Sequence, residues 1–179
     1  MQNEKLIKEA LSYSLASDLH EIWRKNRKLK DGSFDPKYKK SKDEDWNISN
    51  GKDEADIANL SFKELPFNCQ DEELEEPRII IDLVFNKVMA GEEFSHQEIE
   101  KISSIIHKEW QKQNDWIFDP DYGESDLAVP FENLSKEKQD EYSLGIIPGI
   151  KKVESYKNGN LNIEEICEQY GLTHTTKNR

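Results

Sequence analysis

Residues 106–134 read IHKEWQKQNDWIFDPDYGESDLAVPFENL, and an earlier part of the chain carries the same motifs in the same order. The earlier copy has LHEIW at 19–23, DGSFDP at 31–36 and DIANLSFKELP at 56–66. In each copy a helix that ends in H-x-x-W is followed by an F-D-P turn, a loop with an F-x-x-L element and a charged helix. Such self-similarity predicts the duplication of one supersecondary unit, with each half covering the apolar face of the other.

Apolar residues at helical spacing predict the elements around the two copies. The predicted helices run from Glu4 to about Lys28, from about Asp71 to Ala90, from Ser95 through Trp110, from about Lys136 to Tyr156, and from Asn162 to Gly171. We expect Gly91 to end the second helix, Ser95 and Glu98 to form a capping box, Asn162 to cap the last helix, and Pro148 to kink or break the fourth helix. The predicted class is mainly α: two pseudo-repeated helix-loop-helix units packed into one globule, with long loops and at most short β segments.

Three segments follow from the repeat. Residues 1–94 form the first unit, which carries a charged insertion from about Lys37 to Lys52. Residues 95–157 form the second unit, and residues 158–179 form a short helix and a tail.

The composition is that of a polar but folded chain. Of 179 residues, 35% are hydrophobic and 35% charged, yet 9% are aromatic, including four Trp. Large aromatic groups are what disordered chains lack. No apolar run approaches the length that crosses a bilayer, and the start of the chain is not a secretory signal. Cys69 and Cys167 form no metal or disulfide pattern, so we expect a cytoplasmic protein.

The charge is unevenly distributed along the chain. The formal net charge is −12, but the segment from Arg24 to Lys42 holds nine basic residues and only two acidic ones. The surrounding negative field disfavours a long polyanion such as DNA, whereas a short phosphate can still reach a basic patch. The alternative is a solvated basic loop that pairs with the acidic stretch after it.

The second copy resembles the ryanodine receptor (RyR) domain, which occurs in calcium-release channels and as a free-standing module in bacteria and phages. The similarity lies in Ile106–Trp110, Trp116–Pro120 and Leu127–Leu134, and the resemblance extends over roughly residues 15–155. Two departures are Gly32, which stands in the first copy where the second has Trp116, and Asp126, which stands where the family usually has His.

The resemblance implies a non-catalytic, mostly helical module. Bacterial and phage proteins of this kind are similar to domains of nucleotide-signal and defence systems. On this basis we expect a protein that captures a nucleotide or a nucleotide-derived signal, as a phage-encoded sponge or inhibitor of host defence does.

Ligand contacts are predicted from residue type. Trp116 and Trp46 lie in polar, loop-like contexts where an aromatic ring can stack on a base, although each can instead be a hydrophobic plug beneath a loop. Trp23 and Trp110 we assign to the core. Arginine and lysine near a stacking ring would hold a phosphate. The candidate ligand-binding residues are Trp116, Trp46, Arg24, Arg27, Tyr38, Lys39, Lys40, Tyr122 and Asp126.

No catalytic motif is found in the sequence. The chain has no P-loop, no dinucleotide-binding glycine motif, no nucleophile elbow and no H-E-x-x-H pair. We therefore predict no enzyme activity, no cofactor and no metal site.

Two other functions are compatible with the sequence. The runner-up is an acidic inhibitor that imitates the phosphate backbone and blocks a nucleic-acid-processing protein, for which Asp43–Asp45 and Asp71–Glu76 would be needed. A third hypothesis is a structural module that recruits a partner protein. The predicted partners are a nucleotide-like small molecule or a host defence protein, with no direct DNA binding and no membrane; the oligomeric state is left open.

Overall fold

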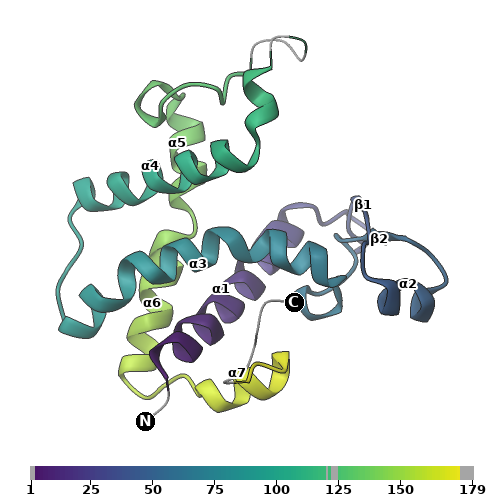
Figure 1. Ribbon diagram of the computed structural model, residues 1–179, viewed down its shortest axis with the longest axis horizontal. Helices are drawn as coiled ribbons and strands as arrows, with labels where there is room; N and C mark the ends of the chain where they lie inside the picture. Colours follow the sequence, from purple (N-terminus) through teal and green to yellow (C-terminus); the bar gives the residue numbers. More distant parts are fainter. Residues whose placement is uncertain (1–2, 120, 122–124, 174–179) are drawn as a thin grey trace.

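The computed structural model describes residues 3–119, 121 and 125–173, and it is mainly helical, as predicted (Figure 1). The long helices are α1 (Glu4–Asn26), α3 (Phe67–Ala90) and α4 (His96–Gln113), and the shorter ones are α2 (Glu44–Asn50), α5 (Lys136–Ser143), α6 (Ile146–Lys157) and α7 (Ile163–Tyr170). The described strands are β1 (Tyr38–Lys40) and β2 (Glu54–Asp56), and 3-10 turns lie at η1 (Phe62–Glu64), η2 (Asp115–Phe118) and η4 (Phe131–Asn133).

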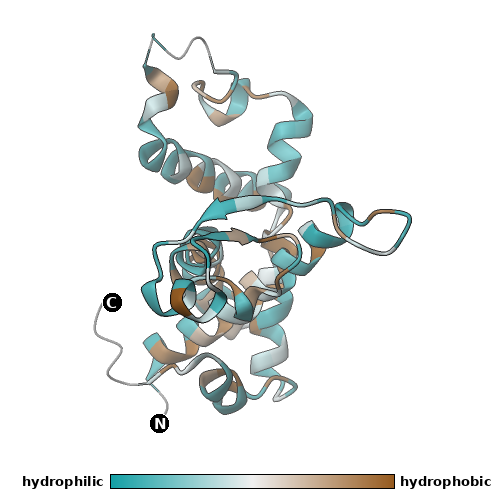
Figure 2. Cartoon of the chain, turned by 90° about the vertical axis from the view of Figure 1, so that its right-hand side faces the viewer, coloured by the Kyte–Doolittle hydropathy of each residue, from teal (hydrophilic) through white to brown (hydrophobic). Residues whose placement is uncertain are grey.

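Helices α1, α3 and α6 enclose the larger hydrophobic core, here called the main core. Its fully buried members include Leu11, Leu15, Ile80, Val84, Ile146 and Val153. Each helix contributes one apolar face, and polar residues cover the outward faces (Figure 2). Helix α7 closes the bottom of this core in the view of Figure 1, with the Tyr170 ring 5.0 Å from the Tyr13 ring.

Helices α4 and α5 stand above α3 in Figure 1. Ile102 and Ile106 on α4 join the main core, so the two copies of the repeated motif share one hydrophobic interior. Helix α6 belongs to the predicted second unit, residues 95–157, but packs chiefly on α3 and α1. The chain therefore crosses back from the second copy into the first.

A second core lies beneath the two-stranded sheet. Strands β1 and β2 are antiparallel, with Tyr38 opposite Asp56 and Lys40 opposite Glu54. This core consists of Ala16, Ala55, Ile57, Phe62, Leu65, Cys69 and Leu74. The charged insertion is thus a structured hairpin and helix rather than a loose loop.

Local signals fix most helix ends. Gly91 ends α3 with a φ of 80°, a left-handed conformation that favours glycine. Ser95 and Glu98 form the expected capping box, and Asn162 caps α7. These three predictions are confirmed.

The predicted helix over residues 136–156, with its kink at Pro148, is wrong in detail. Helix α5 ends at Ser143, and α6 begins at Ile146, so the break lies at Leu144 and Gly145. Pro148 lies in the first turn of α6, where its missing N–H would have had no intrahelical partner. Proline is therefore compatible with this helix and does not kink it.

No helix in the described part of the chain is long and apolar enough to cross a membrane.

The close packing of α6 on α3 depends on Gly149. A Cβ atom at this position would lie 2.4 Å from Ile80 Cγ2 and 3.3 Å from Leu15 Cδ2. We expect Gly149→Ala to lower the free energy of unfolding by about 1–3 kcal/mol, because overpacking outweighs the better helix propensity of alanine. Urea denaturation measures the change. Lys151→Ala, at an exposed position of the same helix, is the control, with an expected change within about 0.5 kcal/mol. Stabilisation by Gly149→Ala would contradict this packing.

Candidate functional site

His20 and His107 make equivalent hydrogen bonds in the two halves. Nε2 of His20 donates to the carbonyl oxygen of Leu60 at 2.9 Å, and Nε2 of His107 donates to that of Val129 at 2.8 Å. Both rings are buried. A carbonyl only accepts, so Nε2 carries the proton in each case. Each histidine therefore ties its helix to the loop that precedes a 3-10 turn.

The residue four positions after each histidine repeats this arrangement. Arg24 Nε donates to the carbonyl of Ala58 at 2.8 Å, and Gln111 Nε2 donates to that of Leu127 at 2.7 Å. In both halves the acceptor lies two residues before the carbonyl that the histidine uses. Equivalent backbone groups of the two loops are thus satisfied by equivalent side chains.

A glutamine on the following helix completes the shared scaffold. Gln70 Nε2 donates to the carbonyl of Leu65 at 3.0 Å, and Gln139 Nε2 donates to that of Leu134 at 3.3 Å. The two halves therefore hold their 3-10 turns from both sides with the same residue types.

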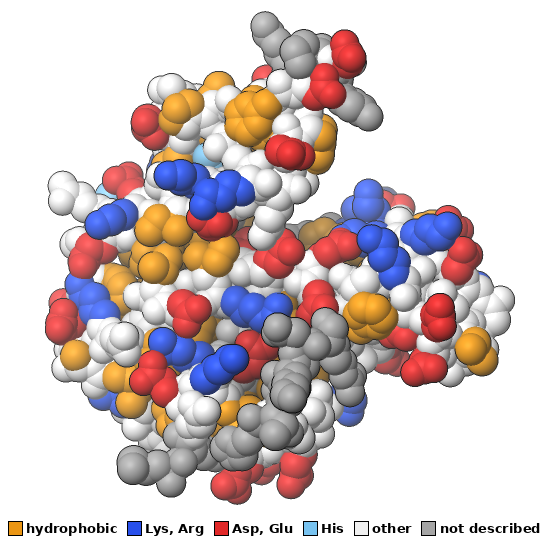
Figure 3. Space-filling model, in the orientation of Figure 1, with side chains coloured by type: hydrophobic (Ala, Val, Ile, Leu, Met, Phe, Trp, Pro, Cys, Tyr) orange, Lys and Arg blue, Asp and Glu red, His pale blue; other side chains and the backbone are white. Residues whose placement is uncertain are grey.

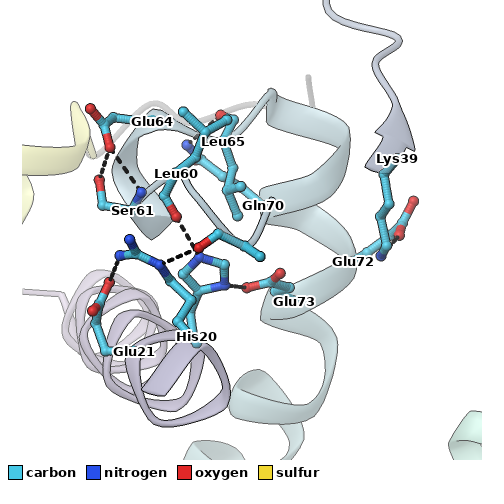
Figure 4. Close-up of polar contacts among 12 residues, drawn as sticks. His20, Glu21, Lys39, Leu60, Ser61, Glu64, Leu65, Gln70, Glu72 and Glu73 are labelled. Atoms are coloured by element: carbon cyan, nitrogen blue, oxygen red, sulfur yellow. Dashed lines mark hydrogen bonds and ion pairs between the residues drawn. The ribbon is translucent and has the colours of Figure 1, made fainter. Parts of the chain in front are cut away.

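The halves differ at the other ring nitrogen of the histidine. Nδ1 of His20 lies 2.8 Å from the Glu73 carboxylate (Figure 4). Tyr142 occupies the equivalent place in the second half, and its ring meets the His107 ring edge-on at 4.8 Å. Nδ1 of His107 has no hydrogen-bond partner among the described residues. The ion pair belongs to the first half alone.

The surroundings of His20 favour its charged form. Burial lowers the pKa of His20, but the hydrogen bond and negative charge of Glu73, together with the Leu60 carbonyl, outweigh it and raise the pKa above the ordinary value of 6.5. Both partners are acceptors, so both ring nitrogens must be protonated for both contacts to form. His20 and Glu73 thus form an ion pair that joins α1 to α3.

Trp23 and Trp110 each lie beside the histidine of their own half. The Trp110 ring stacks on His107 at 6.5 Å, and the Arg27 guanidinium lies 5.4 Å from the Trp23 ring. Both indoles are half-buried, and Trp23 packs against the second core.

Arg24 and Arg27, predicted as ligand contacts, are engaged within the first half. Arg24 pairs with Glu21, and its guanidinium lies 4.6 Å from the Phe34 ring. Arg27 Nη2 donates to the Asp35 carboxylate at 2.7 Å, and its Nε donates to the Asp35 carbonyl. The two arginines therefore shape the loop of the F-D-P turn.

The three candidates on β1 point to two sides of the hairpin. Lys39 Nζ pairs with Glu72 at 2.7 Å on the side that faces α3. Tyr38 and Lys40 share the opposite side, since strand residues alternate. Tyr38 is 60% exposed, and the Lys40 side chain, 78% exposed, lies 3.8 Å from Asp53. Tyr38 and Lys40 are therefore accessible to a ligand.

Sequence reasoning missed the lysines that the fold leaves accessible. Within the described residues, five lysines of the basic segment are exposed and have no ionic partner: Lys25, Lys28, Lys30, Lys37 and Lys42. Together with Tyr38 and Lys40 they are called the basic surface below. Figure 3 shows Lys and Arg side chains gathered over the part of the molecule that carries β1 and β2. The charge count indicated this segment, but it could not tell accessible lysines from paired ones.

Trp46 is positioned as a plug. Its indole Nε1 donates to the carbonyl of Glu64 at 3.0 Å, and its ring packs against the second core. This arrangement matches the alternative in which Trp46 is a hydrophobic plug beneath a loop. It leaves little of the ring surface exposed for stacking on a base.

Trp116 is accessible but far from the basic surface. It lies on η2, at the top of the molecule in Figure 1, whereas β1 lies at the right. Trp116 is 50% exposed and Phe118 54% exposed. Asp126 is also exposed, and Tyr122 lies outside the described residues. The structure therefore does not bring Trp116 together with Arg24, Arg27, Lys39 or Lys40.

No metal site is evident in the part of the chain that the structure describes, because no three His, Cys, Asp or Glu side chains come together there. Comparisons of the chain with protein-family models, with curated proteins and with solved structures found no match. The RyR-like resemblance therefore stays a prediction.

Glu76 lies where the two halves meet. A Cβ atom on Gly145 would be 3.0 Å from Glu76 Oε1. Burial raises the pKa of Glu76 to about 7. Burial, with the nearby charge of Glu76, raises the pKa of Tyr142 to about 12. Ionisation of Glu76 therefore costs stability in the folded state.

The His20–Glu73 pair predicts a pH-dependent contribution to stability. Because the folded-state pKa of His20 is raised, this contribution is fully present below pH 6.5 and is lost as the pH rises through the folded value. We expect Glu73→Gln to lower the free energy of unfolding by about 1–3 kcal/mol at pH 6 and by clearly less at pH 9. Urea denaturation at both pH values measures it, with exposed Glu168→Gln as the control. An equal loss at both pH values would contradict the ion pair.

The raised pKa of Glu76 predicts that substitution of this residue stabilises the protein, whereas substitution of Glu73 destabilises it. The folded-state pKa of Glu76 lies above its ordinary value of 4.5, so the chain loses stability as the pH rises from about 4.5 to 7. We expect Glu76→Gln to raise the free energy of unfolding by up to about 3 kcal/mol at pH 8 and to change it little at pH 4. Denaturation curves at the two pH values test this, and Glu165→Gln, on the surface of α7, is expected to have no such effect.

Proposed function

We propose that the protein is a non-catalytic, RyR-like binding module that captures a nucleotide-like ligand on the basic surface. One observation supports this most: in a chain of net charge −12, five neighbouring lysines stay exposed and unpaired beside an exposed tyrosine. The other basic residues of the segment, such as Arg24, Arg27 and Lys39, are paired within the fold. Five accessible lysines therefore come from this one segment of the described chain, although exposed lysines without an ion pair, such as Lys101 and Lys108, also lie on α4.

The chemistry of the basic surface suits a small phosphate compound. Lysine ammonium groups bind phosphate as point charges, and a tyrosine ring offers a face on which a base can stack. Tyr38 takes the stacking role that the sequence suggested for Trp116. No glycine-rich loop is available, so side chains rather than backbone amides would hold the phosphate.

The acidic remainder of the chain limits the size of the ligand. A long polyanion on the basic surface would also meet the repulsive field of the other elements. A mono- or dinucleotide would meet it much less. Capture of such a molecule is compatible with the sponge role in phage defence that the resemblance implies, and with a cytoplasmic location.

A second candidate function is binding of a basic protein, as in the nucleic-acid mimic. The observation that favours it is the pair of half-exposed aromatic side chains on η2, Trp116 and Phe118, which the exposed residues Asp115 and Asp119 flank in sequence. Carboxylates beside aromatic faces attract arginine and lysine side chains and repel phosphates.

Calorimetric titration with AMP, cyclic AMP and ADP-ribose tests the nucleotide proposal. We expect binding of at least one compound, and Tyr38→Ala to weaken it by roughly 5- to 150-fold, as loss of one stacked base does. The double variant Lys28→Glu/Lys37→Glu is expected to weaken it at least about 10-fold and to reduce its salt dependence.

A matched double variant controls for net charge. Lys101→Glu/Lys108→Glu makes the same charge change at exposed, unpaired positions of α4, and we expect an affinity within about threefold of the wild type. The absence of heat with every compound, or an equal loss in the control, would overturn the proposal. Binding abolished by Trp116→Ala but not by Tyr38→Ala would move the site to η2.

A further inference from the structure

A groove lies at the other end of the main core, away from the basic surface. It is bounded by the C-terminal end of α3, the connection through residues 91–95, the first turns of α4, and α6, all of which lie together on the left of Figure 1. Its volume is about 560 Å³. Its lining includes the apolar residues Phe94, Ile147 and Ile150 and the acidic residues Glu92, Glu93 and Glu154.

The floor of the groove is apolar and incompletely covered. Phe94, Ile99 and Ile150 are only partly buried, and Ile147 is 43% exposed. Apolar side chains grouped in one concave surface are characteristic of a docking site, whereas isolated ones are common on any protein.

The positive charges at the groove are used within the chain. Lys157 Nζ donates to the carbonyl of Val88 at 3.0 Å, which caps the C-terminal end of α3. Lys87 pairs with Glu98, and its ammonium lies 5.0 Å from the Phe94 ring. Lys87 is thereby paired with a carboxylate, whereas Lys157 keeps its positive charge beside the end of α3.

The negative charges at the groove have no such partners. Glu92, Glu93 and Glu154 are exposed, and none of them forms an ion pair with another described residue. The apolar side chains thus have a rim of three carboxylates without an ion pair among the described residues, against the one positive charge of Lys157, within a protein of net charge −12. Phosphate ligands would be repelled here, so this site is separate from the basic surface and does not rest on the function proposed for it.

We propose that this groove binds a basic, amphipathic helical segment of a partner protein. Apolar side chains spaced by one helical turn would lie on Ile147, Ile150 and Phe94, while lysine or arginine side chains would pair with the glutamates of the rim. The net negative charge of the whole molecule would speed the encounter with such a segment. A second copy of the chain is a poor occupant, because two molecules of charge −12 repel each other.

Fluorescence anisotropy with a synthetic peptide tests the groove. The probe is a labelled helical peptide with leucine on one face and lysine on the other, and two matched peptides either replace lysine by glutamate or scramble the order. We expect the basic amphipathic peptide to bind, and both matched peptides to bind at least 10-fold more weakly.

Two pairs of variants locate the binding. Glu92→Lys/Glu93→Lys/Glu154→Lys is expected to weaken binding at least 10-fold. Glu54→Lys/Glu132→Lys/Glu168→Lys, which makes the same charge change at unpaired exposed positions elsewhere, is expected to weaken it less than threefold. Ile147→Asp is expected to abolish binding, whereas Leu29→Asp, 45% exposed at the end of α1, leaves it intact.

Three outcomes would overturn the proposal. Equal losses in the two triple variants would mean that only the overall charge attracts the peptide. Retained binding by Ile147→Asp would mean that the peptide lies elsewhere. Sedimentation that shows a dimer which Ile147→Asp dissociates would assign the groove to a second copy of the chain. Thermal melting confirms that each surface variant is folded.

Discussion

The hydrogen bond from a buried imidazole to a loop carbonyl organises both halves of the molecule. His20 reaches Leu60 across the hairpin and α2, and His107 reaches Val129 across η2 and the loop that follows it. Loop backbone cannot enter a core unless its polar groups are paired, because an unpaired buried carbonyl costs free energy. The bond satisfies that carbonyl and holds the following 3-10 turn, so that Phe62 and Phe131 are buried. The hairpin that carries Tyr38 and Lys40 of the basic surface begins and ends within the segment that His20 closes.

The two copies use one scaffold with different electrostatics. In the first half Glu73 makes the histidine contact an ion pair, and Arg24 and Arg27 bind the loop through their own acceptors. In the second half Tyr142 and Gln111 occupy the equivalent places. The first half is thereby closed by charges, and the second by neutral groups. Separately, the molecule carries a basic surface near β1 and an acidic groove near α6.

Predictions from sequence succeeded where the physics is local. The ends at Gly91, Ser95 and Asn162 followed from groups within a few residues, since a left-handed glycine or a capping side chain acts on its own helix. The same reasoning failed at Pro148. Proline breaks a helix only where an N–H would otherwise be bonded, and the start of α6 was set instead by Gly145, whose missing Cβ lets the chain pass Ile80 and Leu19. That close approach involves residues more than sixty positions away and has no local signature.

The sequence by itself determined the helical class, the repeated motifs and the excess of positive charge between Arg24 and Lys42, because composition and periodicity are properties of the chain. Only the tertiary structure decided which charges remain available to a ligand. Arg24 and Lys39 form ion pairs with Glu21 and Glu72, whereas Lys28 and Lys37 have no ionic partner among the described residues. Trp116 lies apart from all four basic residues. Two charges pair only when they lie a few ångströms apart, because the Coulomb energy falls with distance. Arg24 meets Glu21 within one helix, whereas the pair of Lys39 with Glu72 forms only when β1 packs beside α3. For the same reason the acidic groove could not be read from the sequence, since α3, α4 and α6 form it only when packed together.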